Sequence, residues 1–410
     1  MSERVVHGVS TPRIEVVPGA AVRAFILLLG PLVLFLAGPV RGEPYMAVRE
    51  GFRCSACHVN ITGGGKRNDT LAAHARDILR YPTFFEKLAK PVDAFTGDIN
   101  QYVSLGADLR VSTTLLFQEL GDNGVVHNNT AFRGRLDTVQ VDVNEADLYG
   151  EVRLIPDILS FYVDQRFSPQ TTTREVWGLL RLPYDSFIKA GKMFLPYGLQ
   201  LQDDNAFIRG GRNGSATTGF SFNQQQAGVE VGIEPEPFSL IAAVTDGPPG
   251  DRDVQFTMTA SAMFNDVPLL KNVLGGASFS RVGPPGVQYT VFGFYVGTLL
   301  GPITYLGEVD FLFTKNDMTG GKTRGTFIFY SEVDYLLFKW MNAKVAFDYA
   351  DDDGDLSSRV DDSENRVSVG IEPFLSRFLQ LRLFYRVSNG VESNPSHNQD
   401  LWIAELHLFL

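Results

Sequence analysis

Apolar and polar residues alternate along most of the chain after residue 101. In the stretch YVSLGADLRVSTTL (102–115), Val103, Leu105 and Leu109 face one way, while Asp108 and Arg110 face the other. The same alternation returns in three further segments, at 145–154, 303–313 and 379–386. A period of two residues is that of a β-strand with one apolar and one polar face. The pattern therefore predicts an all-β fold from residue 101 to the end.

The alternating segments repeat many times and are separated by turn residues. We predict sixteen strands, at 102–117, 136–154, 158–167, 174–183, 186–194, 216–232, 236–245, 255–265, 272–282, 288–299, 302–314, 325–337, 341–350, 364–373, 377–387 and 400–410. Most of them reach the length of about ten residues that a tilted membrane strand requires. An even number of strands places both chain ends on the same side of a barrel.

The connections between these segments differ in length. Three are very short (182–186, 339–342 and 375–377), whereas 203–218 and 351–365 are long and polar. A soluble β-sandwich also alternates, but short turns on one side and long loops on the other are typical of bacterial outer-membrane barrels. We therefore expect a transmembrane barrel of about 16 antiparallel strands, spanning residues 101–410, in the bacterial outer membrane and in contact with its lipid.

Two sets of residues fit such a barrel. Aromatic residues at segment ends are candidates for the interfacial girdles: Tyr102, Phe117, Phe327, Tyr330, Trp340 and Trp402. Charged residues on the polar faces are candidates for the wall of an aqueous lumen, which a barrel of this size encloses: Asp108, Arg110, Glu145, Asp147, Glu308, Asp310, Lys344, Asp348, Arg382 and Arg386.

The N-terminal region has a different character. The apolar run Ala24–Gly38 is too short for a membrane span of about 20 residues. It follows Arg23 and precedes small residues, so residues 1–42 are predicted to be a secretory signal peptide, with an uncleaved anchor as the alternative. The net charge is −11, which argues against nucleic acid as a partner and favours cations or basic proteins.

Both cysteines of the chain lie in the motif Cys54-Ser-Ala-Cys57-His58. In an exported protein, C-x-x-C-H is the signature of covalent haem c attachment. Two thiols at this spacing add to the two vinyl groups of the porphyrin, and the adjacent imidazole of His58 then binds the iron. A zinc site would need two more ligands, and a thioredoxin-like redox pair would need a βαβ context. One covalent haem c is therefore the predicted cofactor.

The surroundings of the motif leave several roles open. The sixth iron ligand is His74, on a predicted short helix, or Met46, or no residue at all. Lys66 and Arg67 follow the glycine run 63–65 and are candidates to meet the haem propionates, or they form an exposed basic loop. The acidic stretch 351–365 is a candidate to gather cations such as ferrous iron, or it is an ordinary solvated loop. No catalytic residue is predicted.

A signal peptide, one C-x-x-C-H segment and a barrel together resemble the fused monohaem cytochrome c–porins of bacterial outer membranes, which include iron-oxidising cytochromes. The resemblance rests on Cys54, Cys57 and His58. It implies a partly helical haem domain at 43–100 that plugs the barrel lumen from the periplasmic side. It also implies electron transfer across the membrane between a periplasmic cytochrome and an extracellular metal ion or redox partner, with iron oxidation as one form. The alternatives are a diffusion porin with a structural haem plug, and a haem peroxidase or sensor.

Overall fold

The computed structural model describes residues 44–68, 87, 96–117, 136–201, 203, 205–210, 225–247, 253–283, 286–316, 321–352, 363–376, 378–391 and 397–409. The predicted signal peptide and His74 lie outside these residues, as does most of the acidic stretch 351–365. Within the described part, no helix is long and apolar enough to cross a membrane.

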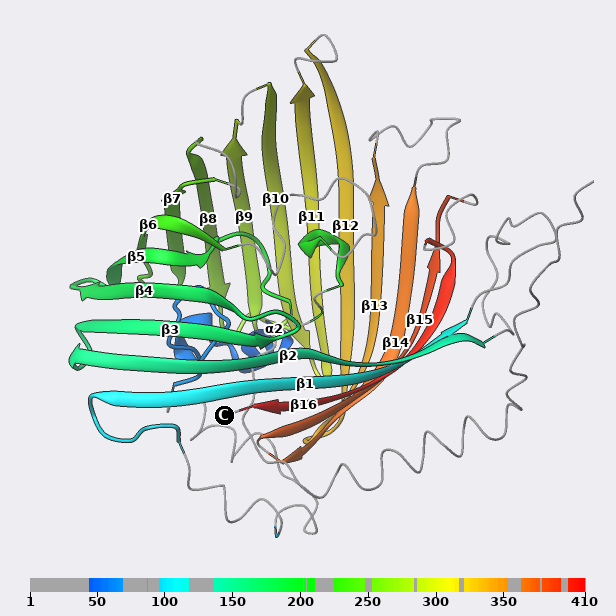
Figure 1. Ribbon diagram of the computed structural model, residues 1–410, viewed down its shortest axis with the longest axis horizontal. Helices are drawn as coiled ribbons and strands as arrows, with labels where there is room; N and C mark the ends of the chain where they lie inside the picture. Colours follow the sequence, from blue (N-terminus) through cyan, green and yellow to red (C-terminus); the bar gives the residue numbers. More distant parts are fainter. Residues whose placement is uncertain are drawn as a thin grey trace, which may run out of the picture. The chain divides into compact units, whose positions relative to one another are not determined.

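Sixteen strands form one closed antiparallel barrel (Figure 1). They are β1 (Val103–Phe117), β2 (Leu136–Ile155), β3 (Leu159–Ser168), β4 (Thr172–Leu182), β5 (Ser186–Phe194), β6 (Gln225–Ile233), β7 (Phe238–Thr245), β8 (Gln255–Phe264), β9 (Val273–Val282), β10 (Val287–Leu300), β11 (Ile303–Asn316), β12 (Lys322–Phe338), β13 (Met341–Asp351), β14 (Glu364–Ser376), β15 (Leu379–Asn389) and β16 (Gln399–Phe409).

Each strand pairs with its neighbours in the sequence, and the first strand closes the barrel on the last. Asp108 of β1 lies opposite Phe409 of β16, and Phe117 lies opposite Asp400. A closed barrel leaves no unpaired strand edge, so every strand finds partners within the chain. The predicted number, order and approximate bounds of the strands are confirmed.

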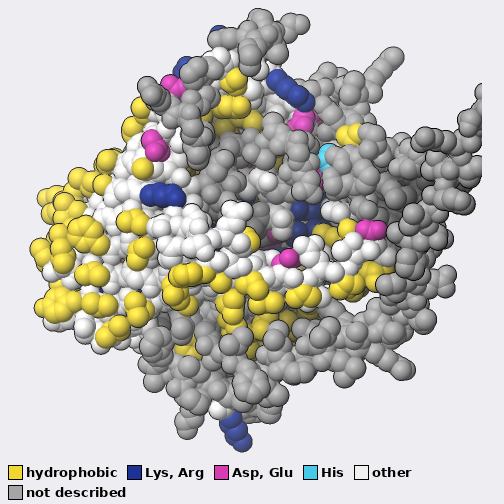
Figure 2. Space-filling view, viewed as in Figure 1, with side chains coloured by type: hydrophobic (Ala, Val, Ile, Leu, Met, Phe, Trp, Pro, Cys, Tyr) yellow, Lys and Arg dark blue, Asp and Glu magenta, His cyan; other side chains and the backbone are white. Residues whose placement is uncertain are grey.

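Alternation along the strands separates two surfaces of the barrel. On β1, Leu105 is 48% exposed on the outer face, whereas Ser104 and Asp108 are buried on the inner face. Hydrophobic side chains gather over the outer face of the strands (Figure 2). Such a surface is unfavourable in water and suits the acyl chains of a bilayer.

The aromatic residues at segment ends divide between these surfaces. Tyr102 and Trp402 are both 48% exposed, as an interfacial belt requires. Tyr330 does not belong to this belt, because it is buried on the inner face and its hydroxyl donates to Glu332. The period of two places Tyr330 on the same side as Glu332 and hence inside, which its position near a segment end did not reveal.

Two segments outside the strands occupy the interior. The first contains helix α2 (Pro44–Glu50) and the single 3-10 turn η1 (Cys54–Ala56). The second follows β5 and contains the 3-10 turn η2 (Phe207–Arg209). Figure 1 shows α2 and the turn after β5 within the ring of strands. The described N-terminal residues and the barrel belong to one compact unit.

The inner segments share hydrophobic cores with the barrel wall. Tyr45 and Val48 of α2 pack in a cluster with Leu306 of β11 and Tyr295 of β10. Val59 and Ile61 pack in a second cluster on the opposite part of the wall, with these barrel residues: Tyr149, Tyr162, Trp177, Leu179, Phe187, Met193 and Ile241. A segment this short cannot bury enough apolar surface alone, so the barrel supplies most of its core.

Candidate functional site

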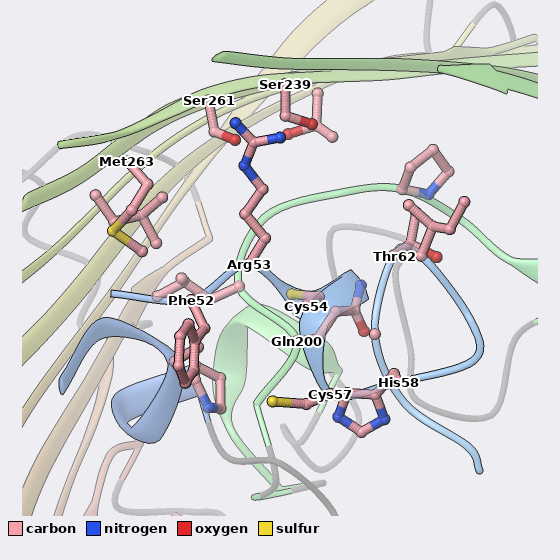
Figure 3. A pocket seen from close by; sticks show the side chains of 18 of the residues that line it. Phe52, Arg53, Cys54, Cys57, His58, Thr62, Gln200, Ser239, Ser261 and Met263 are labelled. Carbon is pink, nitrogen blue, oxygen red and sulfur yellow. The ribbon is translucent and has the colours of Figure 1, made fainter. Parts of the chain in front are cut away.

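The motif Cys54-x-x-Cys57-His58 lies in a compact turn directly after α2. The amides of Cys57 and His58 both donate to the carbonyl of Cys54, at 3.1 and 3.0 Å. These bonds close η1 and direct both thiols and the imidazole into the same region of space (Figure 3). Among the described residues, no set of three or more His, Cys, Asp and Glu is arranged to hold a metal ion.

A short hairpin holds the histidine in place. His58 pairs with Arg67 across an antiparallel bridge, and the amide of Val59 donates to the carbonyl of Lys66 at 3.0 Å. Gly63, Gly64 and Gly65 make the turn with φ of +94°, +79° and +62°. Residues with a side chain rarely adopt such angles, so the glycine run permits this tight return. The His58 side chain is buried by this arrangement.

The two cysteines are not joined by a disulfide. Cys54 can be reached by water through a cavity, yet it lies deep among protein atoms, and this burial raises the pKa of its thiol to about 12. Burial also raises the pKa of Cys57, although the nearby Arg67 partly opposes the effect. Reactive redox pairs have lowered thiol pKa values. These thiols are therefore protonated and differ from those of a thioredoxin-like centre.

A cavity opens between the N-terminal segment, the residues after β5 and the inner wall. Its empty space is about 1500 Å³, including the part that is open to solvent. Cys54, Cys57 and His58 all line it, together with apolar side chains that include Phe52, Ile61, Leu199, Ile241, Met263 and Leu274. The cavity is thus mostly apolar and adjacent to the whole motif.

The other predicted site residues take different places. Arg67 lines the cavity, with its guanidinium carbon 5.2 Å from the ring centre of Phe409. Lys66 is 2% exposed, does not line the cavity, and donates from Nζ to the carbonyl of Arg67 at 2.9 Å. Met46 lines the cavity from α2. His74 lies outside the described residues, so the sixth iron ligand is still predicted to be His74, Met46 or no residue at all.

Hydrogen bonds anchor α2 to one side of the barrel wall. The side-chain amide of Asn272, between β8 and β9, donates to the carbonyls of Val48 and Arg49, each at 2.9 Å. Arg49 in turn donates to Asn342 of β13 at 2.8 Å. Since Val48 is also fully buried, α2 is fixed to the wall by both polar and apolar contacts.

The hairpin is anchored to another part of the wall. Asn60 is fully buried, accepts from Lys189 of β5 at 3.0 Å and donates to Glu175 of β4 at 3.3 Å. The hydroxyl of Tyr162 on β3 accepts from the amide of Lys66 at 3.0 Å. The N-terminal segment therefore extends across the interior from β9–β13 to β3–β5.

The residues after β5 cover another side of the cavity. Leu199 donates its amide to Glu308 of β11 at 2.7 Å, and Arg209 forms a salt bridge with the same carboxylate at 3.0 Å. Tyr197 donates its hydroxyl to Asp310 at 2.9 Å. Tyr197, Leu199 and Gln200 all line the cavity. Sequence patterns gave no sign of this role, because a long loop carries no period that marks it as an internal segment.

The charged residues predicted to line the lumen do face the interior. All ten are buried, and several of them form ion pairs between neighbouring strands. Examples are Arg110 with Glu145 at 3.1 Å and Arg382 with Glu405 at 2.8 Å. The sequence suggested side chains facing open water. Instead, long basic side chains reach carboxylates on adjacent strands and are covered.

Comparison with solved structures defines the architecture. A loop-deletion form of OmpT from Vibrio cholerae matches 75% of this chain and 99% of its own, with 11% identity and a TM-score of 0.54. The fold is that of an outer-membrane porin.

Two further structures support the same fold. The channel DcaP of Acinetobacter baumannii matches 75% of this chain and 97% of its own, with 10% identity and a TM-score of 0.51. An anion-selective porin from Comamonas acidovorans matches 75% of this chain and 99% of its own, with 9% identity and a TM-score of 0.52. No protein-family model and no curated protein sequence matches the chain. At these identities the likeness establishes the porin-like barrel. The chemistry of the site has to be inferred from this chain's own residues.

Proposed function

We propose that this chain is an outer-membrane electron-transfer protein that carries one covalently bound haem c inside a porin-like barrel. The observation that carries the proposal is that Cys54, Cys57 and His58 line one mostly apolar cavity within the barrel. Two thiols and an imidazole at this spacing suit the vinyl groups and the iron of a haem. The bound group would supply one-electron redox chemistry.

The residues of the chain perform the remaining tasks. Cys54 and Cys57 would hold the cofactor as thioethers, and His58, fixed by its pairing with Arg67, would present its imidazole. Phe52, Ile241 and the residues after β5 line the cavity and limit its contact with water. Limited solvent exposure is one of the factors that set a haem reduction potential.

The position of the cavity supports transfer between the two sides of the membrane. The N-terminal segment contacts the barrel at its short connections, for example at Glu234 between β6 and β7 and at Asn272 between β8 and β9. In bacterial barrels the short turns face the periplasm. We therefore place the cavity near the periplasmic end, where a soluble cytochrome would exchange electrons. A donor or acceptor such as ferrous iron would act from the extracellular side.

The fixed position of the N-terminal segment favours this function over that of a diffusion porin. A barrel of sixteen strands without internal segments leaves an aqueous channel. Here the contacts of Asn272, Asn60 and Tyr162 hold a structured segment across the interior. A haem peroxidase or sensor would use the same cavity but would need an open position on the iron, so its spectrum would distinguish it.

Electron transfer into liposomes tests the proposal. The haem-loaded protein is reconstituted into vesicles that contain soluble cytochrome c, and ascorbate is added outside. Reduction of the enclosed cytochrome c is followed by its visible absorbance. We expect rapid reduction with the wild type. We expect none with the Cys54→Ala/Cys57→Ala variant, whose barrel should remain intact. Equal reduction by both proteins would show that ascorbate diffuses through a pore, and this would contradict the proposal in favour of a diffusion porin.

A further inference from the structure

Arg53 precedes Cys54 and lines the same cavity, but its side chain runs in another direction. In Figure 3 it extends away from Cys54 and Cys57 toward Ser239 and Ser261 on the inner wall. Its Nη1 donates to the backbone carbonyl of Glu234, in the connection between β6 and β7. The guanidinium therefore lies at the part of the cavity remote from the thiols, against the barrel.

One nitrogen of this guanidinium is buried without an acceptor. Within the part of the chain that the structure describes, Nη2 of Arg53 has no hydrogen-bond partner. Leaving a buried donor of a charged group unsatisfied is unfavourable, so such a group points to a partner that binds in the cavity. The planar fork of a guanidinium matches a carboxylate, which accepts two parallel hydrogen bonds from it.

The surrounding groups leave room for an added anion. The hydroxyls of Ser239, Ser261 and Thr259 line the cavity. Ser239 donates to Glu234 in this structure, so its hydroxyl would rotate away from Glu234 to donate to an added carboxylate. Two carboxylates line the cavity, those of Glu50 and Glu234. Glu234 is the one that interacts with Arg53, and it accepts from Ser239 at 3.0 Å. Burial raises the pKa of Glu234, while Arg53 and Arg181 oppose this effect and Asp185 adds to it. The Glu234 side chain is thus disfavoured as a permanent anionic partner.

We propose that Arg53, together with Ser239 of β7 and Ser261 of β8, binds a propionate carboxylate of the haem that Cys54 and Cys57 tether. This inference rests on the proposed function. In a haem the propionates lie on the edge opposite to the vinyl groups, and Arg53 points away from the thiols that react with those vinyl groups. Two of the three groups come from the barrel, so the barrel wall is itself part of the haem site.

The assignment replaces Lys66 as a propionate partner. The Nζ of Lys66 donates to the carbonyl of Arg67, and Lys66 does not line the cavity. Arg67 does line it, but it lies close to Cys57 and over the ring of Phe409. The hydroxyls of Ser239 and Ser261 would also fix the cofactor to β7 and β8, through contacts that the N-terminal segment cannot supply alone.

Infrared spectroscopy of the full-length, haem-loaded protein tests the inference, with ¹³C in the propionate carboxyl carbons so that Glu234 does not interfere. Between about pH 5 and 8 the wild type should show only ionised propionate bands. Arg53→Gln should raise one propionate pKa, so that a protonated ¹³C=O band appears at the acidic end. In the same variant the midpoint potential of the haem should fall with rising pH. The slope should approach the value expected when one proton is taken up with each electron.

Arg181→Gln is the matched control, because it removes the same charge near Glu234 while Arg181 does not line the cavity that holds the thiols. It should leave both readouts as in the wild type. Arg53→Lys, which keeps the charge and most of the volume, serves if Arg53→Gln does not fold, and it should alter the splitting of one ionised propionate band. Unchanged propionate bands in the Arg53 variants, or equal changes in Arg181→Gln, would overturn the inference. A protein with no covalent haem would overturn the proposed function as well.

Discussion

At the scale of single residues, burial controls the chemistry of the motif. Cys54 and Cys57 lie among protein atoms that disfavour a thiolate, and His58 is 4% exposed. Arg53 shows the limit of sequence reasoning at this scale. It is adjacent to Cys54 and so could have been considered, but Ser239 and Ser261, toward which its side chain extends, are about 200 residues away and carry no signal in the sequence.

The thiol of Cys54 should react very slowly in protein made without haem. Because alkylation requires the thiolate, a pKa of about 12 lowers the rate at pH 8 by roughly a thousand-fold relative to a free cysteine. Iodoacetamide labelling of the Cys57→Ser variant measures this rate. The rate should keep rising with pH through 10, since the thiolate forms only near the raised pKa. A plateau above pH 9 would contradict the burial of this thiol.

The glycine turn offers a second prediction with an internal control. A Cβ at residue 65 would lie 2.3 Å from the hydroxyl oxygen of Tyr162, whereas a Cβ at residue 64 would meet nothing within 4 Å. Both residues have positive φ, so Gly64→Ala should cost about 1 kcal/mol of stability. Gly65→Ala should cost about 2–4 kcal/mol. Urea unfolding in lipid vesicles measures both, and equal costs would contradict the close contact with Tyr162.

At the scale of elements, the strands follow from the sequence and the inner segments do not. Period two and turn residues predicted sixteen strands, because each strand obeys a local rule of alternation. The segment after β5 was expected only as a long polar loop. Its internal position depends on contacts such as Arg209 with Glu308 and Phe207 with Asp348, which join residues about 100 positions apart or more. Such pairing leaves no local pattern.

The anchoring of α2 leads to a prediction at this scale. Asn272→Ala removes two hydrogen bonds to the end of α2 and should destabilise its docking by about 1–3 kcal/mol. Amide hydrogen exchange in residues 44–52 should then become about ten-fold faster or more. Asn265→Ala is the control, because Asn265 makes one longer bond, of 3.3 Å, to Gly51. Similar exchange rates in the two variants would show that Asn272 does not hold the helix.

At the scale of the whole molecule, a porin-like barrel encloses a segment whose described residues depend on the wall for their core. Val48 packs against one part of the wall, and Val59 and Ile61 pack against another. The barrel could be predicted from the sequence as a whole, and so could a plug within it. The shared cavity could not, because it exists only where the two parts meet.

Ion conductance in planar bilayers tests this arrangement. The wild type should conduct far less than an open barrel of sixteen strands, because the N-terminal segment and the residues after β5 both lie inside. A variant that lacks residues 44–68 should conduct at least several-fold more. If the wild type already conducts as strongly as this variant, the segment does not restrict the lumen.

The most direct test of the central claim is the visible spectrum of the protein, oxidised and reduced, purified from outer membranes of a host that matures c-type cytochromes. The proposal predicts a sharp reduced band of a six-coordinate haem c that survives denaturation and is lost in Cys54→Ala/Cys57→Ala. A high-spin spectrum that shifts with carbon monoxide would instead indicate a peroxidase or sensor. A correctly folded barrel without any haem band would contradict the account and leave a porin with an unusual internal segment.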